Sequence, residues 1–315
     1  MTRPAARPGE DGGHHTGPGA PGFVPDSAID RLRALEDRPD FSGTRYDVFE
    51  AVGRGGMGIV FRGRDRALDR DVAIKVTTWA TAADADRLRA EARTLARLEH
   101  PGIVPVHDVG QLPDGRVFTV MALVRGERLD VRAAALPLFD RLRLFDRVCD
   151  TVSFAHARGL VHRDLKPANI MVGEHGQVLV LDWGLARAER DAGGAGGGTE
   201  GYMAPEPQTA AFDVRADVFA LGAILRDLAA AAGTSVPRPL ASVVGRATDP
   251  DPAQRYATPA AIAADVRRFV DGAAVAAHRE TPLEWTARQA RLYRTPIALV
   301  LAYLTMRALL LLWGR

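Results

Sequence analysis

The sequence predicts an α+β chain in which strands come first, helices follow and a hydrophobic helix lies near the C-terminus. Short apolar runs separated by glycine and proline occupy residues 46–123, a pattern typical of strands. Apolar residues then recur at helical spacing between residues 138 and 155, which predicts a long buried helix. Residues 297–313 are almost entirely apolar. We therefore expect a small β-rich unit, a larger helical unit and a C-terminal hydrophobic helix.

The composition allows one large domain or two small ones and limits the partners. The chain has 315 residues and a net charge of +2, so its charge balance does not favour nucleic acid. Its single cysteine, Cys149, excludes an intramolecular disulfide framework and is typical of a reducing compartment. Residues 1–44 are expected to be a disordered segment or linker, because Gly, Pro and Arg dominate their first half. The first residues contain no apolar core, so we expect no signal peptide.

A glycine-rich stretch lies between the first two expected strands. Residues 53–58 read Gly-Arg-Gly-Gly-Met-Gly, and an apolar run resumes at Ile59. The same glycine spacing in a dinucleotide-binding turn would open a helix. A strand on both sides instead indicates a hairpin that covers phosphates, because glycines let backbone amides approach an anion closely.

Lysine and asparagine are rare in this chain, and their positions are informative. Of 41 basic residues only Lys75 and Lys166 are lysines, and Asn169 is the sole asparagine. Lysine supplies a compact point charge, whereas arginine supplies a rigid fork. A chain that uses arginine almost everywhere has therefore kept lysine where a point charge is wanted.

The polar run that contains Lys166 also holds a carboxylate and a carboxamide. Asp164 can accept a proton from an attacking hydroxyl. Lys166 lies two residues later, so an extended backbone points both side chains to the same side, where Lys166 can neutralise a transferring phosphoryl group. Asn169 offers an oxygen suited to Mg²⁺. The alternative without a catalytic role is that Asn169 caps a helix and the lysines are solvated on the surface.

These motifs resemble those of the protein kinase superfamily, and more narrowly those of the bacterial Ser/Thr protein kinases of eukaryotic type. The stretch HRDLKPAN around Lys166 resembles the motif of Ser/Thr kinases, since tyrosine kinases usually lack a lysine at that position. The resemblance covers roughly residues 46–271. It implies a bilobal fold, with a β-rich N-lobe at about residues 45–123 and a larger helical C-lobe at about residues 124–271.

The resemblance also implies a reaction, in which the γ-phosphoryl group of ATP is transferred to Ser or Thr hydroxyls of protein substrates with the help of Mg²⁺. Asp164 would be the catalytic base, and Lys166 would stabilise charge. Lys75 would hold the α- and β-phosphates and pair with Glu91 on a helix expected at residues 84–99.

The resemblance further assigns the metal ligands and the nucleotide pocket. Asn169 and Asp182 would hold Mg²⁺. Asp182 begins a motif in which Trp183 replaces the usual phenylalanine. The implied nucleotide-binding residues are Gly53, Arg54, Gly55, Gly56, Met57, Gly58, Val60, Ala73, Lys75, Met121, Ala122, Leu123 and Met171.

Further matches lie in the expected C-lobe. Residues 199–206 match the substrate-facing segment of kinases. Asp217 would hold the catalytic-loop backbone, and Arg255 would pair with Glu206, whereas His156 is expected to be structural. Between Glu206 and Arg255 the chain is shorter than in typical relatives, in the region where a substrate-docking helix normally lies.

Two other functions stay open at this point. A pseudokinase scaffold that binds nucleotide and signals by contact is supported only by Trp183 and by the shortened C-lobe. A kinase of small molecules is disfavoured by the intact segment at residues 198–206.

The C-terminal region predicts a membrane anchor. Residues 272–296 are expected to be a basic juxtamembrane linker, and residues 297–313 a transmembrane helix of roughly 25 Å. Arg307 lies near one end, where its long stem can snorkel outward. The arginines before the run favour a single-pass protein of the inner (cytoplasmic) membrane with its kinase domain in the cytoplasm. The alternatives are a cytoplasmic protein whose helix docks on the kinase lobe or on a second copy in a homodimer, and an in-plane helix.

Overall fold

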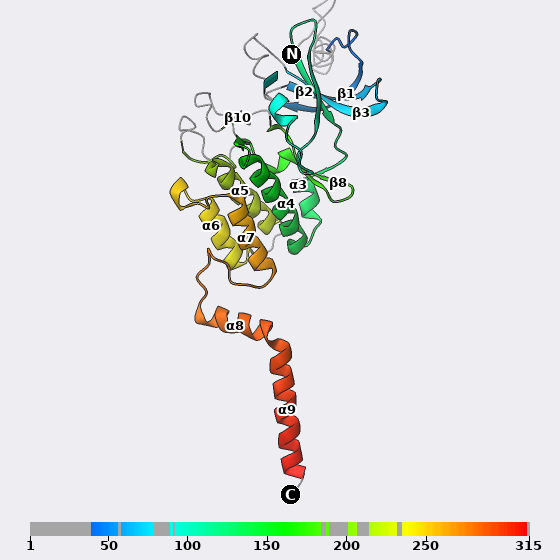
Figure 1. Ribbon diagram of the computed structural model, residues 1–315. Helices are drawn as coiled ribbons and strands as arrows, with labels where there is room; N and C mark the ends of the chain where they lie inside the picture. Colours follow the sequence, from blue (N-terminus) through cyan, green and yellow to red (C-terminus); the bar gives the residue numbers. More distant parts are fainter. Residues whose placement is uncertain are drawn as a thin grey trace, which may run out of the picture.

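The computed structural model describes residues 39–55, 58–77, 89–90, 92–183, 187–188, 201–206, 214–231 and 235–313. Within these residues the chain forms two lobes, and a pair of helices follows the second lobe (Figure 1). This arrangement confirms the predicted α+β class with a β-rich N-lobe, a helical C-lobe and a C-terminal apolar helix.

The N-lobe is built on one antiparallel sheet of five strands in the order β1-β2-β3-β5-β4. The strands are β1 (Tyr46–Gly55), β2 (Gly58–Asp65), β3 (Arg70–Val76), β4 (Val106–Gln111) and β5 (Val117–Ala122). Val72 and Ile74 of β3 are fully buried, and they pack in a cluster with Phe41 and Phe118, whose ring centroids are 4.9 Å apart. Burial of this cluster holds β3 at the centre of the sheet, which fixes the position of Lys75.

The C-lobe is mainly helical, and its core surrounds helix α4. Its elements are β6 (Gly126–Arg128), α3 (Leu129–Ala134), α4 (Leu138–His156), β7 (Leu160–Val161), η1 (Pro167–Asn169), β8 (Ile170–Gly173), β9 (Val178–Val180), β10 (Arg187–Ala188), α5 (Arg215–Ala230), α6 (Arg238–Ala247), η3 (Pro252–Gln254) and α7 (Pro259–Val270). Of the residues that predicted α4, Leu142, Phe145, Val148, Val152 and Ala155 are buried, and Leu138 is partly buried. Because α4 packs against α5 and α7, it delivers the chain to the loop after β7 from a fixed direction.

Two helices follow the C-lobe, α8 (Pro282–Leu292) and α9 (Arg294–Trp313). The sequence predicts a linker for residues 272–296, whereas the structure has α8 there, and α9 begins three residues before the expected boundary at residue 297. In Figure 1, α9 points away from both lobes and α8 runs crosswise between α9 and the C-lobe. None of the window Arg294–Leu311 is buried, and the window is long and apolar enough to cross a membrane.

Candidate active site

The loop after β7 brings together the three polar residues that the sequence singled out. Lys166 donates a hydrogen bond to Asp164 Oδ2 at 2.7 Å. The side-chain nitrogen of Asn169 donates to the backbone carbonyl of Asp164 at 2.8 Å and to its Oδ2 at 3.1 Å. The carboxylate of Asp164 therefore lies between an ammonium group and a carboxamide, with only 17% of its side chain exposed.

Asp217, at the start of α5, holds this loop by its backbone. Its Oδ2 accepts hydrogen bonds from the amide of His162 at 2.8 Å and from Nε2 of His156 at 2.8 Å, and its Oδ1 accepts one from the amide of Arg163 at 2.9 Å. Arg163 has a φ of 71°, a left-handed conformation that costs energy for a residue with a side chain. The hydrogen bonds that Asp217 accepts from the amides of His162 and Arg163 hold the backbone in this conformation. Asp217 therefore holds the catalytic-loop backbone, as predicted.

The ionised form of Asp217 is favoured in this environment. Burial raises the pKa of the Asp217 carboxyl, but the hydrogen bond from His156, together with the amide of His162, more than offsets this effect and leaves the pKa lowered. Asp217 thus stays a carboxylate, which can accept all three hydrogen bonds. His156 is a structural residue as expected, with a specific partner that the sequence did not identify.

His162 links the catalytic loop to the segment after β9. Its buried ring donates from Nε2 to the carbonyl of Leu181 at 2.9 Å, and its Nδ1 accepts from the amide of Asp164 at 3.3 Å. Burial lowers the pKa of His162, so the neutral ring is favoured and its two nitrogens keep these opposite roles. His162 therefore positions the backbone on both sides of the site.

Lys75 of β3 forms an ion pair with Asp182 of the C-lobe. Asp182 has a φ of 56°, and the next residue, Trp183, is buried and donates from Nε1 to the carbonyl of Val180 at 3.0 Å. The Trp183 ring also packs against that of His162, with centroids 4.7 Å apart. The tryptophan therefore fits the site with its only polar group satisfied. Glu91, the expected partner of Lys75, lies outside the described residues.

The glycine-rich stretch forms a hairpin as expected. β1 and β2 pair antiparallel, with Gly55 opposite Gly58 at the end of the ladder; Gly56 and Met57 lie outside the described residues. Gly58 has a φ of 149°, and a Cβ atom there would lie 2.1 Å from the carbonyl oxygen of Val76. A side chain would displace β3, so this position requires glycine.

The residues expected around the nucleotide lie on the strands next to this hairpin. Val60 is paired with Lys75, and Ala73 is paired with Met121. Ala122 ends β5, and its amide donates to the carbonyl of Pro105 at 3.1 Å. The other expected nucleotide-binding residues are Gly53 and Arg54 on β1, Leu123 directly after β5 and Met171 on β8.

Arg255 forms the predicted pair with Glu206. Its Nη1 and Nη2 donate to the two carboxylate oxygens of Glu206 at 2.8 and 2.6 Å, and its side chain is fully buried. Burial raises the pKa of Glu206, but the bidentate hydrogen bonds from Arg255 outweigh burial and lower the pKa. The pair ties the end of the substrate-facing segment to the C-lobe.

Comparison with known proteins agrees with this geometry. The family described as protein kinase domain matches residues 46–236, more than half of the chain, and the chain belongs to this family. It is 38% identical to the serine/threonine-protein kinase PknB of Mycolicibacterium smegmatis over 206 residues, which are 60% of this chain and 33% of that protein. It is 40% identical to the serine/threonine-protein kinase PknA of Mycobacterium tuberculosis over 196 residues, 57% of this chain and 45% of that protein.

A third relative is the DNA damage-responsive serine/threonine-protein kinase RqkA of Deinococcus radiodurans. The identity is 38% over 196 residues, which cover 58% of this chain and 29% of that protein. The chain thus spans less than half the length of these curated relatives. The family match at residues 46–236 covers Lys75, the catalytic loop, Asp182 and Asp217, whereas Arg255 lies beyond it.

Proposed function

We propose that this chain is a Ser/Thr protein kinase that transfers the γ-phosphoryl group of ATP to protein hydroxyls. The observation that carries the proposal is the convergence of Lys166 and Asn169 on the carboxylate of Asp164, at 2.7 and 3.1 Å. Asp164 accepts the proton of the attacking hydroxyl, and Lys166 stabilises the negative charge of the transferring group. Phosphoryl transfer depends mostly on such positioning and electrostatics.

Lys75 and the glycine-rich hairpin supply the other side of the proposed site. Lys75 binds the α- and β-phosphates, and the backbone of residues 53–58 covers them. Adenine would lie between Val60 and Ala73 on one side and Met171 on the other, with backbone groups of Ala122 and Leu123 facing its edge and Met121 at the back of the pocket.

The residues present fit Mg²⁺. Asp182 offers a carboxylate that is 48% exposed, and the nitrogen of Asn169 is used by Asp164, so the amide oxygen is left for a cation. The amide of Leu181 donates to the carbonyl of Asn169 at 2.8 Å, which places Asn169 beside the segment that carries Asp182. Among the described residues no group of three His, Cys, Asp or Glu could hold a metal. Two oxygen ligands from the protein suit Mg²⁺, because this ion completes its coordination with water molecules and substrate phosphates. The bound ion would neutralise negative charge on the phosphates.

The pseudokinase alternative has no observation in its favour. Trp183 occupies its position with its indole nitrogen satisfied, and the polar residues that phosphoryl transfer requires are present. We also infer that α9 anchors the protein in a membrane, with the kinase domain on the cytoplasmic side. The support is the apolar window Arg294–Leu311, none of which is buried, and the arginines that precede it.

The proposed activity is tested by incubating the full chain with labelled ATP, Mg²⁺ and generic Ser/Thr protein substrates. Transfer of label to protein Ser or Thr is expected, and an Asp164→Asn variant serves as the control. Labelled nucleotide that binds without any transfer would support the pseudokinase, and transfer to small molecules alone would overturn the protein substrate class.

A further inference from the structure

Strand β3 carries an acidic residue on the same face as the proposed nucleotide-binding residues. Asp71, Ala73 and Lys75 occupy alternate positions of β3, and the residues between them are fully buried in the core of the N-lobe. Because successive side chains of a strand point to opposite faces of a sheet, Asp71 shares a face with Ala73 and Lys75. It lies two residues, or about 7 Å, beyond Ala73. Asp71 is therefore at the edge of the proposed nucleotide pocket.

Two arginines of β2 reach Asp71 across the sheet. Arg64 is paired with Asp71 in the ladder, and Arg62 is paired with Ala73. Arg64 donates to Asp71 Oδ1 at 3.1 Å, and Arg62 donates to its Oδ2 at 3.4 Å. Asp71 thus connects β3 to the strand that continues from the glycine-rich hairpin.

A third arginine reaches Asp71 from the start of the C-lobe. Arg125 donates from Nη2 to Asp71 Oδ2 at 3.0 Å, although the two residues are 54 positions apart. Arg125 directly precedes β6, in which Gly126 is paired with Gly173 of β8. A Cβ atom at Gly126 would lie 2.3 Å from the carbonyl oxygen of Val172, so the chain runs tightly against β8 at this point. The pair of Asp71 and Arg125 therefore joins the N-lobe to a segment that is fixed on the C-lobe.

Strand β3 is thus joined to the C-lobe at both ends of one face. Lys75 pairs with Asp182 at the catalytic end, and Asp71 pairs with Arg125 at the hinge end. In the proposed complex Lys75 and Asp182 would turn to the phosphates and to Mg²⁺. The pair of Asp71 and Arg125 uses no group that the nucleotide needs, so it can persist when the nucleotide binds.

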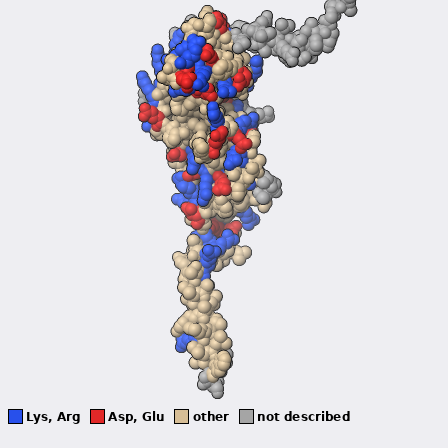
Figure 2. All heavy atoms as spheres, turned by 90° about the vertical axis from the view of Figure 1, so that its right-hand side faces the viewer, with Lys and Arg blue, Asp and Glu red and all other residues tan. Residues whose placement is uncertain are grey.

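The surroundings of Asp71 keep it ionised. Only 19% of its side chain is exposed. Partial burial raises the pKa of the Asp71 carboxyl, but the hydrogen bonds from Arg64 and Arg125 outweigh this effect and leave the pKa lowered. Acidic and basic side chains lie side by side over much of the N-lobe (Figure 2). Asp71 differs from a simple surface pair because one of its partners belongs to the other lobe.

We propose that Asp71 is a positioning residue of the nucleotide site, which fixes the separation of the two lobes at the hinge end of the pocket by binding Arg125. The proposal rests on the proposed kinase function of this site. A pocket whose walls are already held at the right separation loses less freedom when a ligand binds. Loss of Asp71 should therefore raise the Kd for nucleotide and the KM for ATP, while kcat changes little.

Binding of adenosine and of ATP to the full chain in detergent tests the proposal by calorimetry. Adenosine is uncharged, so its binding is insensitive to the change of charge in the variant. Asp71→Asn should raise the Kd for adenosine about two- to fivefold, the contribution expected of a partly exposed ion pair. The Kd for ATP should also rise, although removal of a negative charge alone would favour an anion. An unchanged Kd for adenosine overturns the proposal.

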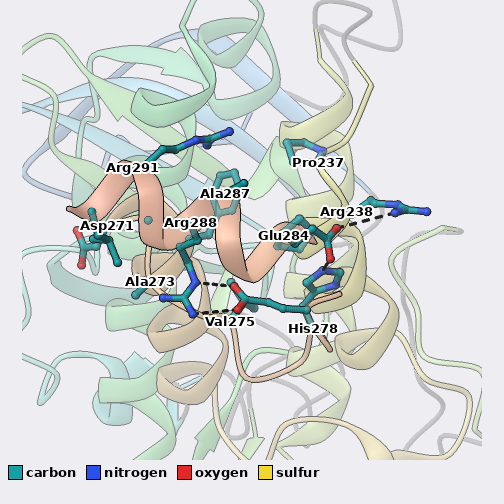
Figure 3. Close-up of a pocket in the computed structure, with 15 residues that line it drawn as sticks. Pro237, Arg238, Asp271, Ala273, Val275, His278, Glu284, Ala287, Arg288 and Arg291 are labelled. Carbon is teal, nitrogen blue, oxygen red and sulfur yellow. Dashed lines mark hydrogen bonds and ion pairs between the residues drawn. The ribbon is translucent and has the colours of Figure 1, made fainter. Parts of the chain in front are cut away.

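Two control variants separate the hinge contact from the loss of a charge or of an ion pair. Asp69 is 85% exposed and, within the described residues, pairs with Arg64 alone. Asp69→Asn removes the same charge from the same cluster, and asparagine tolerates the φ of 49° found there. Glu280→Gln removes a pair with Arg288, at 2.7 and 2.9 Å, beside the cavity between α8 and the C-lobe (Figure 3). Neither control should change the Kd for adenosine, and an equal rise in Asp69→Asn overturns the proposal.

A double-mutant cycle identifies the partner through which Asp71 acts. Arg125→Gln should raise the Kd for adenosine as much as Asp71→Asn does, and the double variant should bind no more weakly than either single variant. If Arg125→Gln binds as tightly as the wild type, or if the two effects add, Asp71 acts within the N-lobe and the proposal is wrong.

The separation of the lobes is measured directly with two spin labels. They are attached to Leu68→Cys in the N-lobe and Arg143→Cys on α4, both more than half exposed, in a chain in which the buried Cys149 has been changed to alanine. Asp71→Asn should broaden the distribution of distances between the labels, and an unchanged distribution overturns the proposal.

The same measurements distinguish failure of this proposal from failure of the kinase function. A wild-type chain that binds ATP without transferring its phosphate overturns the proposed function alone, and the Kd values of the variants still decide the role of Asp71. A wild-type chain that binds neither ATP nor adenosine overturns both.

Discussion

Lys75 of the N-lobe and Asp182 of the C-lobe form an ion pair that joins the two lobes across the candidate site. The two residues are separated by 107 positions in the sequence. The pair brings the cation proposed to bind phosphates next to the carboxylate proposed to bind Mg²⁺. In the proposed complex Lys75 would contact the phosphates directly, and Asp182 would contact them through Mg²⁺.

The first prediction concerns these catalytic groups. Lys75→Met and Asp164→Asn should each lower phosphoryl transfer by about 10²-fold or more, because a general base alone typically contributes a factor of 10²–10⁴. Transfer of labelled phosphate to a protein substrate is the measurement. Thermal unfolding should show that both variants stay folded. Retention of more than a few per cent of transfer by Asp164→Asn would mean that Asp164 is not the base.

The pair of Arg255 and Glu206 predicts a stability effect. Arg255→Met should lower the free energy of unfolding by about 3–5 kcal/mol, because it leaves Glu206 and the carbonyl of Asp249 without their buried partner. Denaturant unfolding measures the change. The double variant with Glu206→Leu should recover part of the loss. If Arg255→Met alone costs no more than a surface substitution, the pair does not support the fold.

Asp217→Asn should weaken the catalytic loop without touching the reacting atoms. Both carboxylate oxygens of Asp217 accept hydrogen bonds from backbone amides, whereas asparagine has only one acceptor oxygen. The NH₂ group of the asparagine would therefore face an amide donor, and the lost hydrogen bond costs about 1–3 kcal/mol. We expect kcat to fall more than tenfold while KM for ATP changes little. Asp146→Asn, which disrupts only an exposed pair with Arg267 on the C-lobe surface, is the control.

The neutral state of His162 predicts how stability depends on pH. Burial lowers the pKa of His162 below its ordinary value of 6.5, so the unfolded chain binds the proton more readily than the folded one. The contribution of neutral His162 to the free energy of unfolding is therefore fully present above pH 6.5. It is lost as the pH falls from 6.5 through the lowered pKa of the folded state. His162→Gln should reduce this slope. His107 also has its pKa lowered by burial, so the comparison is made in a His107→Gln background. An unchanged slope would assign the effect to other groups.

Much of the fold follows from patterns within short stretches of sequence. The helical spacing that predicts α4 depends only on residues within one element, and its buried face matches that prediction. The loop around Asp164 is similarly local, since Lys166 and Asn169 lie within five positions of it. Local geometry therefore suffices to bring these groups together.

Two features were not predicted from the sequence. One depends on packing between residues far apart in the chain, and the other on a local capping motif that the sequence analysis did not use. The contact of Lys75 with Asp182 depends on how the lobes close, which no local pattern encodes. Residues 272–296, which include α8, are expected to be a juxtamembrane linker because Arg288, Arg291 and Arg294 precede the apolar run. Thr281 and Glu284 carry the spacing of a capping box, and Pro282 lies at the first helical position, so the start of α8 could have been predicted.

The last prediction is that α9 holds the protein in the membrane. The helix Arg294–Trp313 has 20 residues, roughly 30 Å in length, which matches the hydrocarbon core of a bilayer. After cell disruption the full chain should sediment with membranes and require detergent for release, because exposing this helix to water is unfavourable.

A chain ending at Arg294 is the matched control, since it keeps both lobes and α8 but lacks the apolar run. It should appear in the soluble fraction, because the described residues contain no other helix that is long and apolar enough to cross a membrane. High salt should not release the full chain. A full chain that stays soluble without detergent would show that α9 docks on protein instead.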